Sequence, residues 1–496
     1  MQLSQPSQHS QFHNLFASLH SFNTFLFLLG ILTYIVSPIV GCVFILLFLQ
    51  IKISSGLLRG KLTNRSDVLS RKTELFLILL VLFAITIYGS TFRVFQDLEN
   101  HIRIYNELEG TGFKGLFNLY DGKIDNREVE PVTFAIPQIL GMIFGYHDGH
   151  FILIQSFTFN LIFTILPCIF FPFLYPLVIL VNITSGAGFD GTSAYFYNMF
   201  LMRQFYSYIF ILFMAFTPSL IINLIFLILS FFTHKSSVMF SFPLLLASIP
   251  YFHKDLSLVP VKSKFFKVLQ FISKSLLDRK IIILLLVFAI SVSLFPALIQ
   301  VYVDNLDIRD IYDYYVYDND ANQHRTFFLI QPSWIATNIL PEISLFVFSA
   351  IYFRDFLSFY LSPRKYAAQT SLFIISIIAT SLLIIGFLTD IHNVFLRPIV
   401  CLVAMKGFLY GFIIESLTFS RKNNRILSRF VAAIVVVFMS FSLGTWFYRN
   451  LLMSYYFFFK ASNVFLSVNV TSLNDIPTIA SNLFDYFDYF FQLVFS

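Results

Sequence analysis

Apolar runs close to the length of a membrane-crossing helix recur from one end of the chain to the other. About 20 consecutive apolar residues cross a bilayer as an α-helix, and polar loops separate the runs. The pattern predicts an all-α polytopic integral membrane protein with about 12 transmembrane helices in a single membrane domain, residues 1–496. The expected spans lie near residues 22–50, 74–92, 151–170, 173–183, 204–217, 219–233, 236–251, 281–300, 335–353, 369–389, 398–418 and 430–450.

Two further segments have an apolar pattern that does not fit a simple crossing. Residues 132–145 form a short apolar run that follows Pro131 and contains Pro137, which predicts a re-entrant or interfacial helix. The tail from Leu483 to Phe495 is aromatic and amphipathic, which predicts a helix on the outer membrane interface.

Charged residues divide the loops into two alternating sets. Basic loops are expected in the cytoplasm by the positive-inside rule, and acidic loops outside. The loops at residues 93–131 and 301–331 lean acidic, so we expect them to be extracytoplasmic, with both chain termini on that side. The basic, cytoplasmic set comprises residues 52–73, 252–280, 354–366 and 420–429.

Composition rules out a sizeable soluble domain. Hydrophobic residues make up 57% of the chain and charged residues 12%, and the mean hydropathy is +0.76. The net charge of +6 follows from the basic loops, so a nucleic-acid partner is not needed to explain it. The three cysteines all lie in apolar runs, which indicates buried thiols rather than a disulfide framework.

The charged segment at residues 93–131 stands out against this background. It holds 13 charged residues among 39, a third of its length. We interpret it as a folded extracytoplasmic loop that begins a sugar-handling site. Helical spacing places Asp97 and His101 on one face, with Arg93 one turn back and Arg103 and Tyr105 following. The alternative interpretation is a solvated helix end with snorkelling charges.

Three more polar sites lie near the outer ends of the predicted spans. Glu130 precedes the short helix, where a carboxylate can cap the helix or act as a general base. Arg203 and Gln204 open an apolar span, where the guanidinium either binds phosphate or snorkels to the interface. His234 and Lys235 stand between two spans, and a turn histidine is either structural or a proton-exchanging group.

Soluble-enzyme motifs are missing from the sequence. There is no phosphate-binding Walker loop, dinucleotide-binding glycine pattern, HExxH or CxxC. A nucleotide-driven pump and a cytoplasmic nucleotide-sugar enzyme are therefore not expected. We also expect no cofactor and no metal, and interpret most of the aspartates in residues 301–331 as facing solvent.

The order of these features over residues 74–251 resembles a known family. An acidic outer loop with Asp97 and Tyr105 ends in Glu130, and a mid-chain Met-Arg-Gln then opens a span at Arg203. His234, with small polar neighbours, follows about thirty residues later. This arrangement resembles the repeat-unit polymerases of bacterial surface polysaccharides, the O-antigen polymerases (Wzy) in their EpsG-like branch. The chain departs from the pattern in a long loop insert and in Lys235 beside the histidine.

The resemblance implies an activity, a substrate and a location. Such polymerases are multi-pass proteins of the bacterial inner membrane. They transfer a growing glycan of O-antigen, capsule or exopolysaccharide from undecaprenyl pyrophosphate to a sugar hydroxyl of the next lipid-linked unit, at the periplasmic face. A flippase and a chain-length regulator of the same pathway are implied as partners.

The implied roles fall on the candidate residues. Cations would meet the lipid pyrophosphate, and a carboxylate or histidine would accept the proton of the attacking hydroxyl. The cations are Arg203 and Lys235 with Arg325 or Arg397 in reserve, the bases are Glu130, Asp97 or His234, and the other substrate-binding residues are Arg93, Arg103, Gln204 and Tyr105, whose ring could stack on a sugar.

Two other classes of function stay open at this point. A transporter or flippase for a lipid-linked glycan should carry inverted repeats and polar residues at mid-membrane. A membrane acyltransferase that modifies surface glycan should centre on a histidine such as His234. The gathering of polar residues near one membrane face favours the polymerase.

Overall fold

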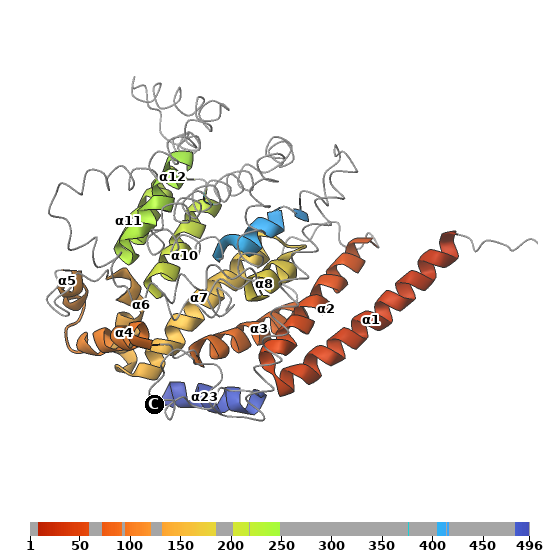
Figure 1. Ribbon diagram of the computed structural model, residues 1–496, viewed down its shortest axis with the longest axis horizontal. Helices are drawn as coiled ribbons and strands as arrows, with labels where there is room; N and C mark the ends of the chain where they lie inside the picture. The colour runs from red at the N-terminus through yellow and green to blue at the C-terminus, as the bar shows by residue number, and fades with distance from the viewer. Residues whose placement is uncertain are drawn as a thin grey trace, which may run out of the picture.

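The computed structural model describes the N-terminal half of the chain and a few later segments, and every element in these parts is helical (Figure 1). The described residues are 8–58, 72–91, 95–120, 131–184, 202–217, 219–248, 375, 404–412, 414–415 and 482–495. The helices are α1 (Gln8–Val36), α2 (Pro38–Leu58), α3 (Lys72–Thr91), α4 (Phe95–Glu107), α5 (Lys114–Tyr120), α6 (Val132–Phe144), α7 (Asp148–Phe170), α8 (Tyr175–Thr184), α10 (Met202–Phe216), α11 (Leu220–Thr233), the 3₁₀ turn η1 (Lys235–Ser237), α12 (Val238–Ser248) and α23 (Leu483–Phe495).

Three of these helices are long and apolar enough to cross a membrane. They cover Pro38–Gly56, Lys72–Ser90 and Asp148–Phe170, with mean hydropathies of 2.0, 2.0 and 1.9. This finding indicates an integral membrane protein built from helices. The spans expected near residues 281–353 and 430–450 lie outside the described residues, so the count of about 12 stays a prediction.

The first expected span, residues 22–50, is wrong as a single crossing. The chain turns at Ser37 into a helical hairpin, in which Phe27 of α1 packs on Phe48 of α2 with ring centroids 5.0 Å apart. Gly41 faces Tyr34 so closely that a Cβ there would collide with the Tyr34 backbone. Pro38 suits the first position of α2, because a helix start needs no amide hydrogen.

A polar ladder joins α3 to α7 in antiparallel order. The Ser156 hydroxyl donates to the carbonyl of Thr86 at 2.9 Å, and the Asn160 amide donates to that of Ile85 at 3.3 Å. All four residues belong to helices of membrane-crossing length. Side-chain hydrogen bonds to main-chain carbonyls fix the register of such helices, since water does not compete for these groups.

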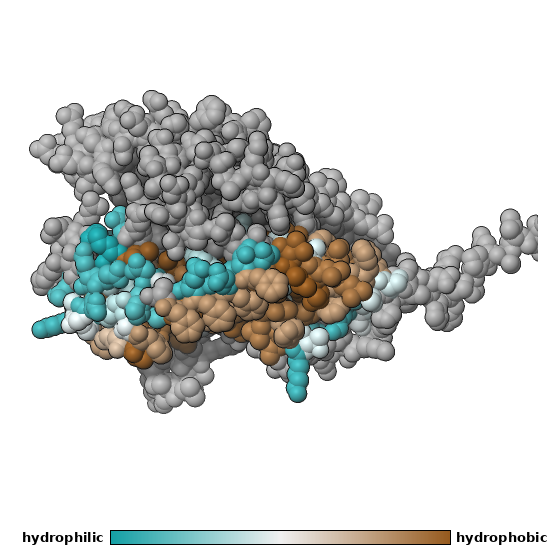
Figure 2. Space-filling view, turned by 90° about the horizontal axis from the view of Figure 1, so that it is seen from below, coloured by the Kyte–Doolittle hydropathy of each residue, from teal (hydrophilic) through white to brown (hydrophobic). Residues whose placement is uncertain are grey.

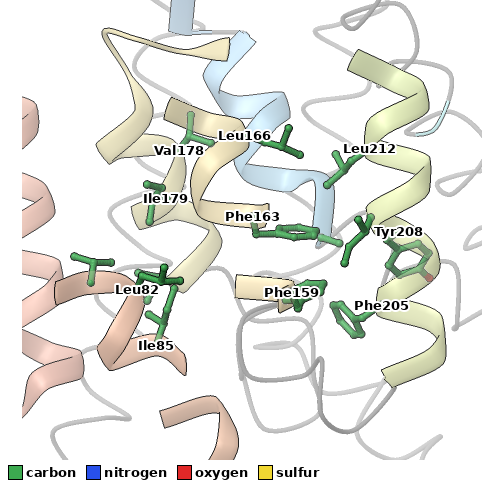
Figure 3. Close-up of a cluster of buried hydrophobic side chains, with 14 of the residues drawn as sticks. Leu82, Ile85, Phe159, Phe163, Leu166, Val178, Ile179, Phe205, Tyr208 and Leu212 are labelled. Atoms are coloured by element: carbon green, nitrogen blue, oxygen red, sulfur yellow. The ribbon is translucent and has the colours of Figure 1, made fainter. Parts of the chain in front are cut away.

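Aromatic packing places α10 beside α7 and parallel to it. Phe205 lies 5.4 Å from Phe159 at one end, and Phe216 lies 4.0 Å from Phe170 at the other, between ring centroids. Figure 3 shows this cluster, in which Phe163 points between the helices. The first turn of α10 therefore lies toward the end of the bundle where α7 begins.

The helix α11 returns antiparallel to α10. Its Asn223 amide donates to the carbonyl of Met214 at 3.3 Å, and Phe226 stacks on Phe213. At its far end Phe232 meets Tyr120 of α5, with ring centroids 5.4 Å apart. The end of α11 thus returns to the side of the bundle that holds α4, α5 and α6.

The short helix predicted at residues 132–145 is confirmed. α6 has 13 residues, too few to cross a bilayer, and stops at Gly145, whose φ of 92° is readily adopted by glycine alone. Three residues after Gly145, α7 begins at Asp148. This turn holds α6 against the start of α7, beside the end of the bundle where α4 lies (Figure 1).

Candidate functional site

One face of the helix α4 packs into the core, and the opposite face is exposed. His101, Ile104, Tyr105 and Leu108 are buried at helical spacing, whereas Arg103 is exposed on the opposite face. The predicted partner of His101, Asp97, precedes it by one turn of the α4 backbone. The amphipathic pattern explains why this charged segment folds as a helix rather than as an open loop.

His101 is the ionisable group on the inner face of α4. Its ring meets the edge of Phe134 on α6, with centroids 5.7 Å apart. Burial and the nearby positive charge of Arg203 lower the pKa of His101 from 6.5 to about 3. The imidazole is therefore neutral at physiological pH, and its Nδ1 atom has no hydrogen-bond partner among the described residues.

Arg203 reaches this position from the first turn of α10, one turn before Tyr206. The Tyr206 hydroxyl donates to the main-chain carbonyl of Gln155 at 2.9 Å, and the Gln155 amide donates to the carbonyl of Thr133 at 3.0 Å. These bonds connect α10, α7 and α6 next to His101. We call His101, Thr133, Gln155 and Arg203 the outer polar cluster.

Several atoms of the outer polar cluster lack partners. Thr133 Oγ1 and Gln155 Oε1 are buried and accept or donate no hydrogen bond within the described structure, like His101 Nδ1. A buried polar atom without a partner costs about 1–3 kcal/mol. Such groups concentrated at one place indicate a bound ligand or water.

A second group of buried polar side chains lies one turn along α4. The Tyr105 ring packs between Tyr146 and Phe151, at 5.1 and 4.9 Å between centroids. Burial, with smaller effects of nearby charges, raises the pKa of Tyr105 to about 12, so its hydroxyl stays protonated. The Tyr146 hydroxyl lies near the Gln138 side chain, whose amide donates to the carbonyl of Gly112 at 2.9 Å. Tyr105 is fully buried, so its ring does not offer a surface for a sugar to stack on.

The outer face of α4 forms an open depression with the start of α7. Its volume is about 560 Å³, and its lining residues are Ile102, Arg103, Asn106, Glu107 and Asp148. Arg103 donates to Glu107 at 2.7 Å, and the Asn106 amide donates to Asp148 at 2.8 Å. The two bonds fix the directions of the four polar side chains.

The remaining predicted residues divide into three groups. Gln204 is buried and its amide donates to the Tyr208 hydroxyl at 2.5 Å, within α10. His234 ends α11 with an extended backbone, and the exposed Lys235 begins η1, which contacts α10. Outside the described residues lie Arg93, Glu130, Arg325 and Arg397.

Thr133, Gln138 and Gln155 were missed by the sequence analysis. Each is one of a few polar residues inside a mainly apolar helix, a pattern that by itself indicates only a local hydrogen bond. The sequence did offer one signal for a polar site: glutamine side chains occur inside apolar segments near a predicted membrane surface. Within the described segments, no group of three or more metal-ligating side chains comes together.

Comparison with protein-family models, with curated proteins and with solved structures finds no match to this chain. The three long apolar helices define the class of the protein, a helical integral membrane protein. A buried polar cluster lies at one end of its bundle.

Proposed function

We propose that the protein is a membrane glycosyltransferase that polymerises lipid-linked oligosaccharide repeat units. It would move a growing glycan from undecaprenyl pyrophosphate to a sugar hydroxyl of the next lipid-linked unit, at the periplasmic face of a bacterial inner membrane. The observation that carries the proposal is the buried His101, close enough to Arg203 for its charge to lower the pKa of the imidazole, beside the unpartnered oxygens of Thr133 and Gln155.

Arg203 supplies the positive charge that a lipid pyrophosphate needs. It lies in the first turn of α10, a 15-residue helix whose amino end carries a partial positive charge. Guanidinium groups bind phosphate oxygens through two parallel hydrogen bonds. In the transition state, negative charge grows on the departing pyrophosphate, so a cation held here lowers the barrier.

His101 is the proposed acceptor of the proton from the attacking hydroxyl. The sugar oxygen forms a bond to the anomeric carbon while the bond to the pyrophosphate breaks, and the proton passes to the imidazole. With its pKa near 3, His101 is a weak base in the empty site. A bound pyrophosphate next to Arg203 adds negative charge, which raises the pKa of the imidazole toward a useful range.

The depression outside α4 suits the saccharide part of the substrate. The formal charge of its lining is −1, because Arg103 faces the carboxylates of Glu107 and Asp148. A pyrophosphate gains nothing from such a lining, whereas sugar hydroxyls can bond to its amide, carboxylate and guanidinium groups. The volume lies in the range of about 300–1,000 Å³ that is typical of ligand sites.

The experiment is to measure surface-glycan length in a host strain that lacks the protein and is supplied with single variants. Arg203→Ala and His101→Gln are expected to leave single repeat units on lipid or core and no long chains. Arg203→Lys keeps the positive charge but loses the guanidinium geometry that forms two parallel hydrogen bonds to a phosphate. It is expected to restore only part of the chain length.

Lys114→Ala is the matched control, because Lys114 is an exposed cation on α5 outside the site. It should give normal chains at the same membrane level of protein. Loss of all surface glycan, with lipid-linked units held inside, would instead identify a flippase. Unchanged chain length in the deletion strain would contradict the proposal.

A further inference from the structure

The helix α23 is bound by one face to the ends of two membrane-length helices. Tyr486, Tyr489 and Leu493 form its buried face. The Tyr489 hydroxyl donates to the carbonyl of Ser90 at 2.9 Å, and the His150 ring donates to that of Val494 at 2.7 Å. Ser90 ends the apolar part of α3, and His150 belongs to the first turn of α7. α23 therefore lies across this end of the bundle (Figure 1).

The opposite face of α23 presents a row of phenylalanines. Phe484, Phe487, Phe491 and Phe495 follow each other at intervals of three or four residues and expose between 45% and 79% of their surface. This spacing aligns them on one side of a helix. Figure 2 shows the face of the molecule on which α23 lies, where apolar side chains form a band next to hydrophilic ones. We call these four residues the phenylalanine stripe.

The phenylalanine stripe adjoins the outer flank of α3. Phe487 packs on Phe83, with ring centroids 5.3 Å apart. Phe83 continues the line of Phe76 and Leu79, which are exposed by 59% and 51% on the flank of a membrane-length helix. Phe83 precedes Ser90 by seven residues, or about 10 Å along the axis. The stripe thus extends an apolar surface that already runs along the crossing helix.

We propose that α23 is an interfacial helix whose phenylalanine stripe is embedded in the outer leaflet, at the boundary of head groups and acyl chains. The occupant of this face is bilayer lipid. A helix with an apolar side and a polar side lies in the interface plane, with its apolar side a few ångströms deep. Polar residues border the stripe along one edge: Asp488 and Gln492 are exposed and bonded to each other at 3.0 Å.

The test places a tryptophan on each side of the helix in the full-length protein in phosphatidylcholine vesicles. The variants are Phe491→Trp on the stripe and Gln492→Trp on the polar side, each read as added fluorescence over the parent with its own two tryptophans. Lipids brominated near the head-group end of the acyl chain should quench the added signal of Phe491→Trp at least about twofold more than that of Gln492→Trp.

Acrylamide in the water should show the reverse order, with Gln492→Trp quenched more. Equal quenching of both variants by brominated lipid would overturn the proposal. Protection of Phe491→Trp from acrylamide and from brominated lipid alike would also overturn it, since a protein or a second copy of the chain would then cover the stripe. Neither result depends on polymerase activity, so a failure of the proposed function leaves this test intact.

Discussion

Burial beside Arg203 keeps the imidazole of His101 uncharged, with a pKa of about 3. The two residues are 102 positions apart in the sequence and belong to α4 and α10, and both of these helices pack against α6 and α7. A half-buried cation therefore lies near a buried, neutral imidazole. The pairing therefore has consequences for stability as well as for chemistry.

The stability of the protein is expected to fall as the pH is lowered from about 6.5 toward 3. In the folded protein His101 stays neutral over this range, whereas in the unfolded chain it takes up a proton below its usual pKa of 6.5. Unfolding is then favoured by about 1.4 kcal/mol for each pH unit below 6.5. Between about pH 7.5 and pH 5 this amounts to about 2 kcal/mol.

The measurement is the midpoint of thermal unfolding in detergent at these two pH values, for the parent and for His101→Gln. Glutamine at position 101 does not titrate, so the unfolding midpoint of the variant should fall less between about pH 7.5 and pH 5 than that of the parent. Equal falls in both proteins would show that His101 does not titrate on unfolding as described. Arg203→Gln should give an intermediate result, because burial still lowers the pKa of His101 without the neighbouring charge.

The hairpin of α1 and α2 is expected to be sensitive to a single methyl group at one glycine. Gly41→Ala places a Cβ against the backbone of Tyr34, which cannot move aside without parting the helices. We expect a loss of about 1–3 kcal/mol, the usual effect of overpacking. Gly30→Ala is the milder comparison, because its Cβ would lie 3.2 Å from the Ile45 side chain and 3.3 Å from the Ile45 backbone nitrogen, whereas a Cβ at Gly41 would lie much closer to the Tyr34 Cα. Unfolding midpoints that drop equally for both variants would contradict the hairpin contact.

The hairpin also reverses the expected side of the N-terminus. Residues 52–73 are rich in lysine and arginine and are placed in the cytoplasm by the positive-inside rule. Because α1 runs antiparallel to α2, the start of α1 returns to the same side. A fluorescent protein that matures only in the cytoplasm should therefore be bright when fused before Met1. A dark fusion at normal protein level would favour the original expectation of an outside terminus.

The sequence predicted elements well where the pattern itself carried the information. α6 was expected at residues 132–145 and is found at Val132–Phe144, and the amphipathic tail helix has the predicted bounds, Leu483–Phe495. The short length of its apolar run predicted α6, and the amphipathic periodicity of the tail predicted α23. The turn at Ser37 was missed because no charge or polar cluster interrupts the apolar run at that point. When two apolar helices of a membrane protein pack on each other, the short turn between them need not lower the hydropathy of the sequence.

The site was predicted only in part for a different reason. Charges near a predicted membrane surface selected Arg203, whereas His101 was noted only as sharing a helical face with Asp97 and was not among the expected bases. Thr133 and Gln155 could not be selected, since each looks like any polar residue that bonds within its own helix. Their importance comes from the convergence of four helices that are distant in sequence. That convergence depends on tertiary packing, which periodicity does not encode.

The depression between α4 and α7 yields the most direct test of the saccharide side of the proposed site. Asn106→Leu removes the amide that orients Asp148 at 2.8 Å and places an apolar group in the lining. Asn106 is exposed, so the variant should unfold within about 0.5 kcal/mol of the parent. If sugar hydroxyls bind here, glycan chains should shorten severalfold while Arg203-dependent binding of inorganic pyrophosphate to the purified protein stays unchanged. Asp488→Leu, an equally exposed polar position on α23, should leave chain length normal. Glycan chains of normal length in Asn106→Leu would show that the depression does not bind the saccharide, and the proposed site would then consist of the outer polar cluster alone.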